Sequence, residues 1–78
     1  MKELVLFLAK QLVNHPDAVE VKETQGETAS VLELKVARED IGRVIGKQGR
    51  TAKSIRTILN AVASRTNRKV VLEILEEK

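Results

Sequence analysis

The apolar residues change from a helical to a strand-like spacing and back along the chain, and this order restricts the fold more than any other feature. Residues 1–14 predict a helix with one apolar face, because leucines recur at four-residue spacing. Pro16 ends this helix, since proline cannot continue it and restricts the residue before it. Apolar and charged residues then alternate over residues 19–22 and 32–36, which predicts two strands joined as a hairpin near Gly26.

The second half of the chain predicts two helices and a last strand. Residues 38–45 form a short helix that Gly46 ends, and residues 50–65 carry a continuous apolar stripe at helical spacing. Alternation returns over residues 70–75. The order helix, strand, strand, helix, helix, strand indicates an α+β fold, with three helices packed on one face of a three-stranded sheet. We expect residues 1–78 to form a single domain.

The size of this domain limits how it can be stabilised. A chain of 78 residues lies near the lower end of what folds without help. It has no cysteine and one histidine, which argues against disulfides, a structural metal or a cofactor. The core must be aliphatic, and we expect Phe7, the only aromatic residue, to pack within it. A core this small favours oligomerisation.

Two further features bear on location and binding. No apolar run approaches the roughly 20 residues of a membrane span, and the first residues lack the layout of a signal peptide, so we expect a cytoplasmic protein. Residues 38–69 carry nine basic and two acidic residues, a net charge of +7, within a chain of net charge +3. Such a concentration suits a phosphate backbone, although ordinary solvated helix faces would account for it equally well.

Two glycines bracket two polar residues between the predicted central helices. At residues 46–49 (Gly-Lys-Gln-Gly) a phosphodiester backbone can lie close to the chain, because neither glycine has a side chain to block it. The amides that open the next helix lie at the positive end of its dipole. Lys47, with Arg50 and Lys53 one turn on, adds mobile positive charge. The loop is therefore a candidate site for phosphate groups.

Other sites for phosphate or for catalysis fit poorly. A Walker A loop needs four residues between its glycines, but three separate Gly42 from Gly46, and Gln48 follows Lys47. The dinucleotide fingerprint fails on the same spacing. No grouping of serine, histidine and carboxylate suggests a nucleophile, and the acidic residues are expected to be solvated. We therefore expect that the protein is not an enzyme.

The loop and its flanks resemble the signature of KH domains. Residues 44–49 (Val-Ile-Gly-Lys-Gln-Gly), with Ile55 six residues further on, are similar to the apolar-Ile-Gly-x-x-Gly pattern followed by an isoleucine. KH modules clamp about four nucleotides of a single strand at this loop. The element order resembles the type II KH arrangement, and residues 15–17 and 44–53 are similar to the small stand-alone bacterial KH proteins of the KhpA family.

This resemblance implies an RNA-binding protein of the cytoplasm, an RNA chaperone or post-transcriptional regulator. It implies action as a homodimer or with a second KH protein of the KhpB type, also called Jag or EloR. Single-stranded RNA would be gripped by the loop and by a groove beside it. The expected interface consists of Gly46, Lys47, Gln48 and Gly49 in the loop, Arg38, Arg43, Arg50 and Lys53 around the groove, and Ile41, Val44, Ile45 and Ile55 as its floor. Without an aromatic platform, one copy should bind weakly and with strong salt dependence.

Two simpler interpretations stay open. The glycines of residues 46–49 are also compatible with a helix cap and a tight turn alone. The chain is also compatible with a protein-interaction module that dimerises without touching nucleic acid, because Ile58 and Ala61 broaden the apolar stripe beyond one core face. Lys47 and Gln48 argue against that module, since a degenerate loop often acquires acidic residues. We expect the dimer to form through the margin at Ile58 and Ala61, or through the first helix.

Overall fold

The computed structural model describes residues 1–76 and has the predicted order of elements. Its helices and strands are α1 (Lys2–Leu12), β1 (Glu20–Gln25), β2 (Ala29–Val36), α2 (Ile41–Ile45), α3 (Arg50–Ala63) and β3 (Lys69–Glu76). The predicted helix over residues 38–45 is divided, because Arg38–Asp40 form a 3-10 turn before α2 begins. The first helix ends at Leu12, and Pro16 opens a separate 3-10 turn.

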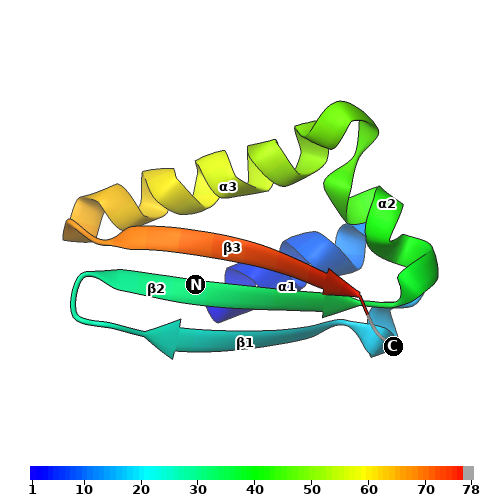
Figure 1. The fold of residues 1–78 in the computed structure, drawn as a ribbon, viewed down its shortest axis with the longest axis horizontal. Helices are drawn as coiled ribbons and strands as arrows, with labels where there is room; N and C mark the ends of the chain where they lie inside the picture. The colour runs from blue at the N-terminus through cyan, green and yellow to red at the C-terminus, as the bar shows by residue number, and fades with distance from the viewer. Residues whose placement is uncertain (77–78) are drawn as a thin grey trace.

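The sheet has β2 at its centre (Figure 1). β1 pairs with β2 in antiparallel orientation, and a tight turn joins the two strands. In this turn the amide of Gly26 donates to the carbonyl of Ala29 at 2.7 Å. β3 pairs with β2 in parallel, with Leu34 placed between Val21 of β1 and Ile74 of β3. A parallel pair needs a long crossover connection, and here α2 and α3 make it. The loop between these two helices is thereby held at one end of the sheet.

The core lies between the sheet and the helices and is aliphatic. Alternate residues of β2, which point to one face of the sheet, are buried (Ser30, Leu32, Leu34 and Val36). Val5 and Ala9 of α1 cover this face, and the apolar stripe of α3 covers it through Ile55 and Leu59. Figure 1 shows α1 passing behind the sheet and α3 running along β3. None of the helices within residues 1–76 is long and apolar enough to cross a membrane.

Phe7 does not pack in this core, and the expectation that it would was wrong. Its side chain is 61% exposed. The helical period explains the difference, because Val5 and Ala9 take the side of α1 that faces the sheet, and Phe7, midway between them in sequence, points away from it. The smaller residues therefore fill the interface with the sheet, and the one aromatic ring is left on the surface.

Candidate nucleic-acid interface

The loop between α2 and α3 (residues 46–49) turns through three residues with positive φ. Gly46, Gln48 and Gly49 have φ angles of 77°, 58° and 76°. At Gly46 space excludes a side chain as well, because a Cβ atom there would lie 2.6 Å from the Cβ of Thr51. Gly49 has open space around it, so a glycine is favoured there only because of the positive φ angle. The backbone therefore carries no side chain at the first and last residues of the loop.

Lys47 and Gln48 form the exposed tip of the loop. Gln48 adopts the left-handed conformation without being a glycine, which costs an ordinary residue about 1–2 kcal/mol and is a form of strain that clusters at functional sites. The amides of Gly46 and Gly49 donate to the carbonyls of Gly42 and Gly46, at 2.8 and 3.1 Å. Within the described chain the amides of Lys47 and Gln48 show no such bond, so they remain available to an outside acceptor.

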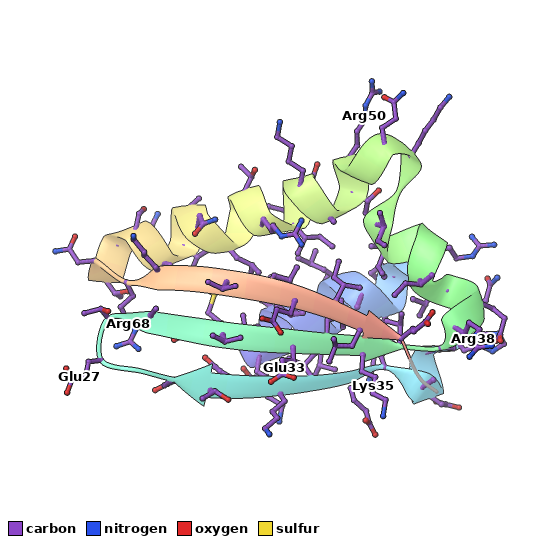
Figure 2. The ribbon with its side chains drawn as sticks, viewed as in Figure 1. Glu27, Glu33, Lys35, Arg38, Arg50 and Arg68 are labelled. Atoms are coloured by element: carbon purple, nitrogen blue, oxygen red, sulfur yellow. The ribbon has the colours of Figure 1, made fainter. Side chains whose placement is uncertain are left out.

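Positive charge surrounds this tip. Arg50 and Lys53, in the first turns of α3, are exposed, and Figure 2 shows Arg50 at the loop end of the helix, pointing away from the sheet. Gly49 is the N-cap of α3 and offers no side chain to cap its first amides. The start of the helix therefore combines free N–H donors, the positive end of the dipole and mobile cations, which is the chemistry that phosphate groups require.

The four apolar residues expected as the groove floor divide into two layers. Val44 and Ile55 are 0% and 4% exposed, so they belong to the core and leave almost no surface for a base. Ile45 is 38% exposed and Ile41 is half-buried. The accessible apolar surface beside the loop is therefore made by Ile41 and Ile45, and the other two residues support it from beneath.

The basic side chains expected around the groove do not all lie at the loop. Figure 2 shows Arg38 at the end of α2 remote from Arg50. Arg43 is held by an ion pair with Asp40, whose Oδ1 lies 3.8 Å from its Nε. The side-chain oxygen of Asn14, in the amide orientation that satisfies its neighbours, accepts from Nη2 and Nε of Arg43 at 3.0 and 3.2 Å. Arg43 therefore links α2 to the chain that follows α1, in addition to any contact with a ligand.

Asp40 is the centre of this link and is fully buried. Its carboxylate accepts from the backbone amides of Asn14 and His15, at 3.1 and 2.9 Å. These bonds connect the turn after α1 to the residue that caps α2. The expectation that acidic residues are solvated was wrong here, because the carboxylate is needed to satisfy two backbone donors in the interior.

Arg56 is a candidate residue that the sequence analysis did not select. Its Nη2 lies 3.4 Å from the carbonyl oxygen of Leu72 in β3. This contact joins α3 to β3. Arg56 follows Lys53 by three residues, which places both on one side of α3. That spacing was the available signal, and it was overlooked.

The chain matches a known protein family and several named relatives. A family model described as KhpA/KhpB, KH domain, matches residues 2–74. The RNA-binding protein KhpA of Chlamydia pneumoniae is 54% identical over the whole of both chains. The RNA-binding protein KhpA of Clostridium perfringens is 57% identical over 96% of this chain and all of its own.

A solved structure shows the same fold within a larger protein. The crystal structure of Era in complex with MgGDPNP and a segment of 16S ribosomal RNA matches with a TM-score of 0.62 and 26% identity. The match covers 96% of this chain and 29% of the Era chain. This chain is therefore similar to less than a third of Era.

Proposed function

The chain belongs to the KhpA/KhpB family of KH domains, and we propose that it binds single-stranded RNA at the loop of residues 46–49. The observation that carries the proposal is the positively charged loop, in which Gly46 has no room for a side chain and the amides of Lys47 and Gln48 have no partner among residues 1–76. The names of the KhpA relatives, at 54% and 57% identity, support RNA as the ligand.

The strand would be held in two ways. Its phosphates lie over the loop, where the free amides and the start of α3 donate hydrogen bonds and Lys47, Arg50 and Lys53 neutralise charge. Its bases lie on the apolar surface of Ile41 and Ile45. Neither contact forms or breaks a covalent bond, so we infer a binding protein and not an enzyme. Such a protein acts on RNA as a chaperone or as a post-transcriptional regulator.

Salt dependence tests the phosphate contacts directly. We expect the logarithm of the binding constant to fall linearly with the logarithm of salt concentration, with a slope of about −0.7 for each contact on a single strand. A strand clamped over about four nucleotides gives a slope of about −2 to −3 per domain. Fluorescence anisotropy with a labelled single-stranded RNA, repeated over a range of salt, measures this slope. A slope near zero would exclude binding through phosphates.

We further propose that the protein works as a homodimer or with a KhpB-type partner, because one groove without an aromatic platform binds weakly and two linked grooves bind more tightly. α3 offers a surface for this contact. Ile58 and Val62, one turn apart on the same flank, are 42% and 46% exposed. Val62 also lines a pocket of about 230 Å³, together with Met1 and residues of all three strands.

Replacing Ile58 with Glu should convert the dimer to a folded monomer. Burying what is exposed of Ile58 contributes about 1 kcal/mol in each copy, and an unpaired buried carboxylate costs several more. We therefore expect the dimer dissociation constant to rise about 100-fold or more, and RNA affinity to fall as two grooves become one. Sedimentation measures the first effect and anisotropy the second.

Thr57→Glu is the matched control, because it adds the same charge at the adjacent exposed position, on the outer side of α3. It should leave the dimer intact. An Ile58→Glu protein that remains a dimer would remove this flank from consideration.

A second candidate function, protein interaction without RNA contact, is favoured by the exposed Phe7, Ile58 and Val62. It predicts a dimer that shows no RNA binding at any salt concentration.

A further inference from the structure

A pocket of about 230 Å³ lies at the end of α3 remote from the loop of residues 46–49. Its apolar wall is made by four residues, Met1, Val62, Ala63 and Val70. α3 is 14 residues long, so it separates the pocket from the loop by about 20 Å. Figure 2 shows Arg68, which also lines the pocket, near the C-terminal end of α3, and Arg50 at its N-terminal end. The pocket is therefore distinct from the proposed RNA site.

The helix-covered face of the sheet carries polar residues at this pocket. Alternate residues of β1 point to one face, so Glu23 and Gln25 lie on the same face as the buried Val21. Gln25 pairs in register with Ser30 of β2, which is 4% exposed. All three polar residues line the pocket. Positions that elsewhere on this face hold core residues therefore present a carboxylate, an amide and a hydroxyl to one cavity.

The carboxylate of Glu23 is poorly satisfied by the protein. No ion pair within residues 1–76 involves it. Nε2 of Gln25 donates to its Oε2 at 3.4 Å, which is a long hydrogen bond. A carboxylate only accepts, and its two oxygens together have room for about four hydrogen bonds. Most of the acceptor capacity of Glu23 is therefore available to a ligand.

Arg68 supplies donors to the same pocket. Its Nη2 donates to the carbonyl of Gly26 at 2.7 Å and to Oγ of Ser30 at 3.3 Å, and its Nη1 donates to the carbonyl of Glu27 at 3.5 Å. These contacts fix the guanidinium and use three of its five N–H donors, which leaves two among the contacts of residues 1–76. The pocket thus combines an acceptor and donors whose charges are of opposite sign.

We propose that this pocket binds a guanine base. Its volume lies below the roughly 300–1,000 Å³ of pockets for drug-sized ligands, so it suits a single ring system. The opposite charges of Glu23 and Arg68 favour a neutral ligand with donors and acceptors, and the apolar wall favours a flat ring.

The hydrogen-bonding groups select guanine among the bases. Guanine is the standard base with two adjacent N–H donors, at N1 and N2, and these match the two carboxylate oxygens of Glu23. Its O6 and N7 accept from arginine, which Arg68 provides. The base belongs either to an RNA strand or to a free nucleoside or nucleotide.

Guanosine and adenosine are the probes, titrated into isotope-labelled full-length protein and followed by the NMR chemical shifts of its backbone amides. We expect guanosine to shift the signals of Glu23, Ser30 and Arg68, and to bind at least about tenfold more tightly than adenosine. Glu23→Gln turns one acceptor into a donor that opposes the donors of guanine, and should weaken guanosine binding at least about tenfold. Glu20→Gln is the matched control, because it makes the same change on the uncovered face of β1. It should leave the affinity unchanged.

A titration with single-stranded RNA identifies the source of the base. If a strand containing guanines binds more tightly than the same strand with adenines in their place, and Glu23→Gln removes the difference, the base belongs to RNA. If Glu23→Gln loses guanosine but binds both strands like the wild-type protein, the ligand is a free nucleoside or nucleotide.

Three results would overturn the guanine site: equal affinity for guanosine and adenosine, wild-type guanosine binding by Glu23→Gln, or an equal loss in Glu20→Gln. The NMR spectra show at the same time that each variant is folded. The site does not depend on the proposed function, because its probe is a nucleoside. A wild-type protein that binds guanosine but no RNA would overturn the proposed function and leave the guanine site standing.

Discussion

The double variant Lys47→Asp, Gln48→Asp is expected to lose RNA binding and keep its fold. The substitutions change the charge at the tip of the loop by three units, and each unit facing a phosphate at about 4 Å in water is worth about 1 kcal/mol. We therefore expect affinity to fall by about 100-fold or more. The fold should survive because both residues are exposed and aspartate tolerates the left-handed conformation that Gln48 adopts.

The chain contains a matched control for this variant. Lys10 and Gln11 are an adjacent lysine and glutamine, both exposed, on α1. Replacing them with Asp changes the net charge of the protein by the same three units on a different helix, outside the loop. A gel-shift series at fixed salt should show wild-type affinity for this control, and circular dichroism should show folded protein for both variants. An equal loss in both would mean that net charge, and not the loop, controls binding.

Asp40→Ala is expected to be the most destabilising of these substitutions. Asp40 accepts two backbone hydrogen bonds in the interior, from Asn14 and His15, and its carboxylate lies beside Arg43. Removing it leaves two amide donors partly buried without partners, at a cost of about 3 kcal/mol. The free energy of unfolding of a domain this size is about 4–12 kcal/mol, so the loss is a large fraction of the total. The Tm should fall by about 10–25 °C.

Urea unfolding measures this loss, with two comparison variants. Asp40→Asn keeps one acceptor oxygen and should lose less than Asp40→Ala. Glu39→Ala removes the neighbouring carboxylate, which is exposed and lies 3.6 Å from His15, and should change the free energy of unfolding by less than about 0.5 kcal/mol. Equal effects of Asp40→Ala and Glu39→Ala would contradict the role of the buried carboxylate. A stable Asp40→Ala protein would contradict it as well.

The sequence by itself determined the type and order of the elements and the position of the loop. These features depend on neighbours along the chain: leucines four apart in residues 1–14, alternation in the strands, and the two glycines of residues 46–49. Periodicity shows which side of an element is apolar, because side chains of a helix or strand repeat at a fixed interval. The same local reasoning identified Lys47 and Gln48 as the loop tip, and the structure places both at the surface.

Only the tertiary structure decided which apolar and charged residues reach the surface. Val44 and Ile45 are adjacent and both apolar, yet one is 0% exposed and the other 38%, because the packing of α2 on its neighbours selects the buried side. Asp40 is buried through contacts 25 and 26 residues away in sequence, and Arg56 reaches a carbonyl 16 residues away. Contacts over such separations depend on how the helices sit on the sheet, and local spacing contains no information about that arrangement.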